Sequence, residues 1–166
     1  MSESTFAPDA ALSDVVMELE AHAAQSGWDR PATLYALVDT AAFAAAQPSL
    51  ASLLGLEPGQ IEPGSLTPIE QDHFDEPLEQ VLPTIAFDDN VVGIAVVVER
   101  PAEAGVPTAE GGEQEHMRVI AGVTRAGSAY CAARSRVHDR PEAVVTGDDL
   151  VPALVDLLRA VLEEDQ

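Results

Sequence analysis

The stretch MRVIAGVTRAGSAYCAARSRV, residues 117–137, contains two mainly apolar runs on either side of Ala126 and Gly127. Two such runs joined by a short glycine-containing turn are typical of an antiparallel hairpin. If the turn includes a glycine bulge, one side of the hairpin is small and apolar, with Met117, Val119, Ala121 and Val123 opposite Val137, Ser135, Ala133 and Cys131.

The other side of this predicted hairpin is the charged one, with Arg118, Ile120, Gly122 and Thr124 opposite Arg136, Arg134, Ala132 and Tyr130. A shift of one residue would place Val119 against Arg134 and mix the two faces. The pattern therefore favours the bulged register.

Before the hairpin, apolar residues at three-and-four spacing predict a helix over residues 9–26, which Gly27 would end. Pro31 favours an extended start to a strand over 32–39, apolar on both sides, and a short Ala-rich helix over about 40–46 follows. Thr67, Pro68 and Glu70 have the order of an N-cap, a first helical residue and a capping-box acid, so a helix is predicted from Thr67.

Further along, Leu78, Val81 and Leu82 predict a short helical segment, and residues 91–99 a second clear strand. A wide apolar stripe over residues 150–162, capped by Asp148 or Asp149, predicts a final helix that lies across the sheet. Together these elements predict an α+β fold: a mostly antiparallel sheet of about four to five strands, covered by N-terminal, central and C-terminal helices.

One domain is expected from a length of 166 residues. Residues 1–8 are predicted to be a flexible N-terminus, and residues 9–166 a single α+β domain. The segment at about 101–116 is rich in Gly, Pro and Glu and is predicted to be a mobile loop.

The charge of the chain limits its partners. It has 29 acids against 8 bases, a formal net charge of -21, which opposes binding to nucleic acid or to an anionic membrane surface. The single cysteine, Cys131, cannot form an internal disulfide, and the N-terminus does not resemble a signal peptide. We therefore expect a cytoplasmic protein whose partner is another protein or a second copy of this chain, with no nucleic acid and no membrane.

The segments GWDRPATLYALV, LTPIEQ, VVERP, AGVTRAG and GDDLVPALV, taken in this order, give the chain a resemblance to a family of uncharacterised acidic actinobacterial proteins. The resemblance covers nearly the whole chain from the first helix onward. Because that family has no assigned activity, it implies no cofactor and no catalytic residue. The order of elements is also similar to that of secretion-chaperone-like α+β proteins.

Two pairs of side chains have the spacing of metal ligands on a helix: Glu70 with His73, and Glu18 with His22. Each pair supplies too few ligands for a site, and a glutamate near a histidine is expected by chance in so acidic a chain. We predict no metal site and no cofactor.

Nucleophilic chemistry is also disfavoured. Cys131 falls on the predicted core face, where cysteine usually acts as a small hydrophobe. His138 and Asp139 follow each other at a strand end, so they would point to opposite faces and are more typical of a loop. Neither a phosphate-binding loop nor a nucleophile elbow is present in the sequence.

The arginines form the one surface whose function is worth testing. Arg118, Arg134 and Arg136 share a predicted sheet face with Tyr130, and like charges at paired positions are destabilising unless an acid lies between them. A glutamate or aspartate from a helix, Glu99, or water would supply the compensation. The alternative is a groove for a carboxylate-bearing ligand, which the forked guanidinium geometry suits.

Two functions follow from these observations. The first, which we favour, is a non-catalytic binding or regulatory module, a chaperone-like protein-interaction domain. The second is an enzyme or small-molecule binder that recognises a carboxylate-bearing ligand through Arg118, Tyr130, Arg134 and Arg136. Trp28 is predicted to pack over the joint between the first helix and strand, with Asp29 and Arg30 at the surface or paired locally.

Overall fold

The structure is a computed structural model that describes residues 3–53, 55, 65–74, 78–85, 87, 91–101, 116–136, 139–147 and 150–164. Its centre is a six-stranded open sheet in the order β2-β1-β3-β4-β5-β6, in which every neighbouring pair is antiparallel. The α+β class is confirmed. The predicted four to five strands is slightly too few, because β2 was expected to be helical and β6 has only three residues.

The strands are β1 Ala32–Asp39, β2 Leu66–Phe74, β3 Val91–Pro101, β4 His116–Thr124, β5 Ala129–Ser135 and β6 Val145–Gly147. The helices are α1 Glu3–Ser26, α2 Thr40–Ala46, α3 Pro48–Leu53, α4 Leu78–Val81 and α5 Pro152–Glu164, with short 3₁₀ turns at Leu82–Thr84 and Pro141–Ala143. The bounds of β1 and α2 are those that the sequence predicts, and α2 is capped by Asp39, whose Oδ2 accepts a hydrogen bond from the amide of Ala42.

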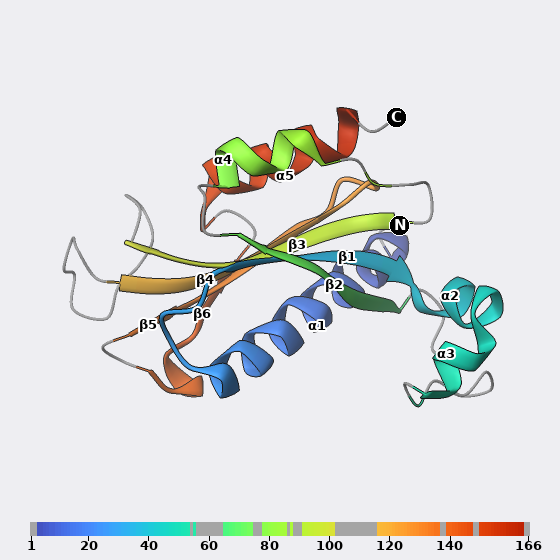
Figure 1. The fold of residues 1–166 in the computed structure, drawn as a ribbon, viewed down its shortest axis with the longest axis horizontal. Helices are drawn as coiled ribbons and strands as arrows, with labels where there is room; N and C mark the ends of the chain where they lie inside the picture. The colour runs from blue at the N-terminus through green and yellow to red at the C-terminus, as the bar shows by residue number, and fades with distance from the viewer. Residues whose placement is uncertain are drawn as a thin grey trace.

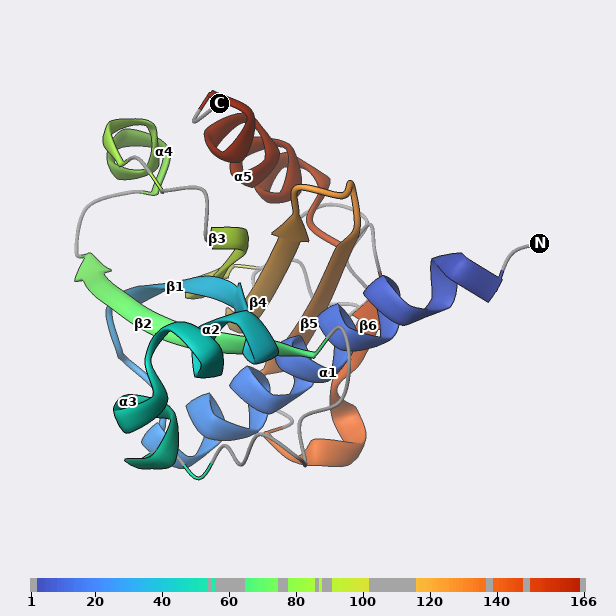
Figure 2. The same cartoon turned by 90° about the vertical axis from the view of Figure 1, so that its right-hand side faces the viewer.

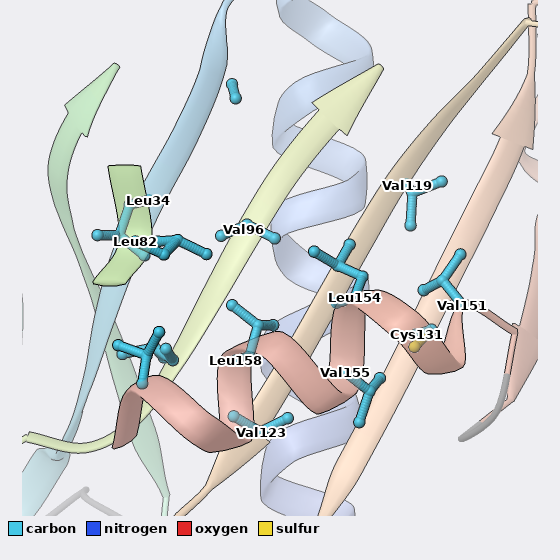
Figure 3. Close-up of a cluster of buried hydrophobic side chains, with 14 of the residues drawn as sticks. Leu34, Leu82, Val96, Val119, Val123, Cys131, Val151, Leu154, Val155 and Leu158 are labelled. Carbon is cyan, nitrogen blue, oxygen red and sulfur yellow. The ribbon is translucent and has the colours of Figure 1, made fainter. Parts of the chain in front are cut away.

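Helices cover both faces of the sheet. Helix α1 lies along one face, and α4 and α5 lie on the other (Figure 1). The side chains of α5 pack on β3, β4 and β5 around Leu154, Leu158 and Cys131 (Figure 3). A second, smaller core lies between α1 and the opposite face, built around Leu12, Val16, Leu37, Ile120 and Ala132. The sheet is therefore the middle layer of three, and Cys131 is a buried core residue as predicted.

Residues 66–74 form the edge strand β2, so the helix predicted from Thr67 is wrong. The capping order of Thr67, Pro68 and Glu70 is a local signal, and pairing with β1 along the whole segment outweighs it. Pro68 is tolerated because an edge strand has a partner on only one side.

The hairpin of β4 and β5 has the predicted faces but a different register. Val119 pairs with Ala133 and Ala121 with Cys131, two residues away from the predicted partners. The turn is tighter than expected: Gly127 adopts φ +101°, and its amide donates to the carbonyl of Thr124. A shift of two residues keeps each side chain on its predicted face, and it places Arg118 directly opposite Arg134.

Helix α1 begins at Glu3, six residues before its predicted start, and its first turns extend beyond the sheet (Figure 2). Gly27 ends it with φ +87°, as predicted. Most of the predicted mobile loop, residues 102–115, and the predicted caps Asp148 and Asp149 lie outside the described residues. Among the described helices, none is long and apolar enough to cross a membrane.

Candidate functional site

Two buried arginines lie side by side on the α1 face of the sheet. Arg118 on β4 and Arg134 on β5 are directly paired, and their side chains are only 2% and 5% exposed. Glu20 of α1, itself 2% exposed, lies against both of them. Paired like charges at such depth require an opposite charge, and the helix supplies it.

Glu20 is bound more closely to Arg134 than to Arg118. Its Oε1 accepts a hydrogen bond of 2.9 Å from Nη2 of Arg134, and its Oε2 lies 2.7 Å from Nε of the same residue. The second contact joins opposite charges but is too poorly aligned to be a hydrogen bond. Oε2 lies 3.7 Å from Nη2 of Arg118, so Arg118 is only partly neutralised.

Asp139 and Trp28 continue the network from Arg134. Nη1 of Arg134 donates to Oδ1 of Asp139 at 3.0 Å, and the indole Nε1 of Trp28 donates to Oδ2 at 2.9 Å. The hydrogen bond from Trp28, and then that from Arg134, lowers the pKa of Asp139 below its ordinary value. Although burial acts to lower the pKa of Arg134, its hydrogen bonds to Glu20 and Asp139 raise it overall.

Trp28 also holds the guanidinium of Arg118. The Cζ atom of Arg118 lies 4.5 Å from the centre of the indole ring, and Nη1 donates to the carbonyl of Gly27 at 3.3 Å. Both contacts fix the plane of the guanidinium, because a cation over an aromatic face is attracted by the ring. Burial lowers the pKa of Arg118, although Glu20 opposes this effect.

Arg136 closes the outer side of this network. It lies just past the end of β5 and donates two hydrogen bonds, of 2.9 and 2.8 Å, to the carboxylate of Asp29. The amides of Asp29 and Arg30 in turn donate to the two carboxylate oxygens of Glu99 at 3.0 and 3.1 Å. Asp29, at φ +64°, is therefore held in a left-handed conformation by contacts from β3 and from the residue that follows β5.

A cavity of about 190 Å³ lies beside Arg118, between α1 and the sheet. We call it the Arg118 cavity; its polar walls include Arg118, His22, Thr33, Tyr35, Glu70 and His73. Nε and Nη2 of Arg118 are buried without a hydrogen-bond partner among the described residues. Buried guanidinium nitrogens are normally bonded. A carboxylate in the cavity would reach these two only if the packing around Arg118 shifted, and it would then be stabilised by them.

A bulge in β2 shapes the far wall of the cavity. His73 pairs with Thr33 and Glu70 with Tyr35, so Gln71 is the extra residue in this part of the ladder. Residues three apart on a regular strand point to opposite faces, whereas the bulge puts Glu70 and His73 on the same face. Nε2 of His73 lies 2.6 Å from Oε2 of Glu70, and Nδ1 lies 3.1 Å from the hydroxyl of Thr33.

A model of the PPA1309-like protein family matches residues 12–163, which is nearly the whole chain. The chain belongs to the PPA1309-like protein family. No curated protein matches the chain, and no solved structure does.

The structure brings together only part of the predicted site. Arg118, Arg134 and Arg136 lie in one network, in which only Arg118 lines the cavity. Tyr130 lies opposite Gly122 and packs with the core under α1. It is four residues along β5 from Arg134, which separates the two Cα atoms by about 13 Å. The compensating acids are Glu20, Asp139 and Asp29. The sequence offered an acid from a helix, Glu99 or water; Glu20 is the helix acid, whereas Glu99 accepts from the amides of Asp29 and Arg30.

Trp28 lies at the joint between α1 and β1, and Asp29 and Arg30 lie at the surface, as predicted, although Asp29 does not pair locally. Its partner Arg136 is 107 positions away in the sequence. Glu70 and His73 are neighbours as the spacing suggested, though through the β2 bulge and not through a helix. Among the described residues, no group of three or more His, Cys, Asp or Glu side chains is placed to hold a metal ion.

Substitution of Asp139 by asparagine is expected to remove part of the acid sensitivity of this PPA1309-like protein. The folded-state pKa of Asp139 is lowered, so its stabilising effect is full above the unfolded-state pKa of about 3.9 and is lost as the pH falls through the folded-state value. Urea unfolding should show the variant less stable at pH 7 by up to about 1 kcal/mol, since Asp139 is partly exposed, and the difference should shrink as the pH falls below about 3.9. The exposed Asp156→Asn is the control, and a pH-independent difference for Asp139→Asn would contradict the assignment.

Proposed function

We propose that this protein is a non-catalytic binding or regulatory module that takes a small carboxylate-bearing ligand in the Arg118 cavity. The observation that carries the proposal is the state of Arg118, which is almost fully buried, stacked on Trp28, and left with two nitrogens that lack a hydrogen-bond partner among the described residues. A planar carboxylate is the acceptor that fits a guanidinium fork best.

Support for Arg118, rather than for the whole arginine face, comes from the neighbouring charges. Arg134 is held by Glu20 and Asp139, and Arg136 by Asp29, so these two arginines are occupied within the protein. Among the described residues, the ion pair of Arg118 is the longer contact with Glu20, at 3.7 Å. A cavity of about 190 Å³ is smaller than the roughly 300–1,000 Å³ of sites for drug-sized ligands, which favours a small ligand.

Binding is favoured over catalysis by the groups that line the cavity. The hydroxyl of Thr33 lies beside His73, but it is buried on a strand and is also within hydrogen-bond distance of the carbonyl of Pro31. Cys131 lies in the core under α5, on the opposite face of the sheet. Neither group is placed as a nucleophile at the Arg118 cavity.

Titration with sodium acetate tests the proposal, with sodium chloride at equal ionic strength as the reference. Acetate should shift the backbone NMR signals of Gly27 and Arg118 in a saturable way, and Arg118→Gln should weaken acetate binding about tenfold or more, because a charge-assisted pair of hydrogen bonds is lost. Arg118→Lys, which keeps the charge but loses the fork, should also bind weakly. Arg136→Gln is the matched control outside the cavity and should keep the affinity.

The proposal would be abandoned if acetate caused no shift beyond that of chloride. It would equally be abandoned if both Arg118 variants, shown to be folded by circular dichroism, bound acetate as the parent does.

A chaperone-like interaction with another protein is the second candidate function. It is favoured by the apolar surface of α3, where Leu50 and Leu53 are 44% and 82% exposed. A second cavity, of about 320 Å³, is lined by Leu50 together with Val38, Phe43 and Ala46, among others. Large exposed apolar residues on one helix are typical of contact surfaces. Two such side chains support a protein interaction less strongly than the buried, unsatisfied Arg118 supports ligand binding.

The setting of this function is part of the same proposal. A net charge of -21 supports a protein that does not bind nucleic acid or anionic membranes. The proposed location is the cytoplasm, and the resemblance noted in the sequence supports membership of an acidic family of actinobacterial proteins. Binding of the ligand would regulate contact with another protein or with a second copy of the chain.

A further inference from the structure

The charges around the Arg118 cavity are balanced, although the chain as a whole is strongly acidic. Arg118 and Arg30 contribute two positive charges to its lining, and Glu70 and Glu99 two negative ones. A ligand with only negative charge would gain from Arg118 but would be repelled by the glutamates and by the net charge of -21. A ligand with one charge of each sign avoids that repulsion.

Of the two glutamates, Glu70 is the one placed to meet a ligand. Both carboxylate oxygens of Glu99 accept hydrogen bonds from backbone amides, at 3.0 and 3.1 Å. Glu70 is about half exposed, and its Oε2 contacts the ring of His73, which is equally exposed. The negative charge of Glu70 also reaches Tyr35, whose pKa is raised by burial and then by this charge.

We propose, building on the proposed function, that the ligand is a small zwitterion, an amino acid or a short amino carboxylate. Its carboxylate binds Arg118, and its ammonium group binds Glu70 at the opposite wall of the cavity. The β2 bulge allows Glu70 to line the cavity, because it places Glu70 and His73 on the same face of the sheet.

The sheet register sets the scale of the ligand. Glu70 pairs with Tyr35, Tyr35 with Ala95, and Arg118 with Glu99, so the two charged residues lie three strand spacings and four residues apart. At about 4.8 Å per strand and about 3.3 Å per residue, their Cα atoms are about 20 Å apart. Both residues line the same cavity, and a small molecule charged at both ends would span the part of this gap that their long side chains leave.

Three matched pairs of probes test the inference: glycine against acetate, β-alanine against propanoate, and 4-aminobutanoate against butanoate. Within each pair the two molecules share a carbon chain and differ in the ammonium group. At least one amino acid should bind about three- to tenfold more tightly than its partner, as expected for a partly exposed charge-assisted contact. The pair with the largest ratio reports the charge separation that the cavity accepts.

Glu70→Gln should abolish that preference and leave alkanoate binding within about twofold of the parent, since Arg118 is untouched. Because Glu70 is half exposed, this variant should fold normally, and Glu18→Gln on the exposed side of α1 is the matched control. A preference that survives in Glu70→Gln overturns the role of Glu70.

The two proposals fail in different ways. If alkanoates bind through Arg118 but no amino acid binds more tightly, the zwitterion is rejected and the carboxylate site stands. If no probe of either kind binds, both the carboxylate site and the zwitterion are rejected.

Discussion

Glu20→Gln should lower the free energy of unfolding by about 3–5 kcal/mol, the range for removing one member of a buried ion pair. Glu20 lies against two arginines that face each other across β4 and β5, and all three side chains are almost fully buried. Without the carboxylate, two positive charges remain close together in a region of low dielectric. The lost interaction is therefore more than one hydrogen bond.

Urea unfolding followed by circular dichroism measures this effect. Glu18→Gln is the matched control, because Glu18 is exposed on the same helix and should change the stability by less than about 0.5 kcal/mol. Adding Arg118→Met to Glu20→Gln should recover part of the loss, because Arg134 keeps its contact with Asp139 and the charge of Arg118 is then absent. A loss below about 1 kcal/mol for Glu20→Gln would show that the network is not a structural ion pair.

The same substitution separates stability from binding. Glu20 competes for Arg118 at 3.7 Å, and its removal makes the guanidinium a stronger partner for an anion. Folded Glu20→Gln should therefore bind acetate at least as tightly as the parent, despite its lower stability. Lower stability together with equal or tighter binding is the trade-off expected when a group that binds a ligand is also held by a stabilising contact within the protein.

Much of the sheet could be predicted from the sequence because its signals are local. Alternation over residues 117–135 fixed which side chains share a face, since the side-chain period of a strand is two. The register was not fixed by this pattern, because a shift of two residues preserves every face and only the geometry at Gly127 decides between the alternatives.

β2 shows the opposite case, in which a local signal was misleading. A threonine, a proline and a glutamate in capping order are compatible with a helix start, and no feature of residues 66–74 alone reports that β1 lies alongside. The segment is also bulged, so its apolar and polar residues do not alternate regularly, and the period that would have identified a strand is missing.

The candidate site depended on contacts that no local pattern contains. Arg134 and Glu20 are 114 positions apart, and Trp28 and Asp139 are 111 apart. The sequence did indicate that paired arginines need a compensating acid, and this chemical requirement is met. It could not select Glu20 among 29 acids, and the cavity itself exists only because α1 and the bulged β2 meet on the same face of the sheet.

Leu158→Ala should lower the free energy of unfolding by about 2–5 kcal/mol, an effect comparable to that of Glu20→Gln. Leu158 is fully buried at the centre of the core between α5 and the sheet (Figure 3). Truncation removes its contacts and leaves a space that the neighbouring helix and strands fill only in part. Leu157→Ala, on a partly buried side of the same helix, should have a smaller effect.

The core of Leu158 and the Arg118 cavity lie on opposite faces of the sheet, so this variant also tests whether the cavity is independent of global stability. Acetate affinity, measured on the folded protein, should be unchanged in Leu158→Ala, since effects at distant sites are usually additive. A loss of affinity in Leu158→Ala that matched the loss in Arg118→Gln would mean that weakened folding, and not the missing guanidinium, accounts for both. Unchanged affinity in Leu158→Ala beside lost affinity in Arg118→Gln assigns binding to the α1 face alone.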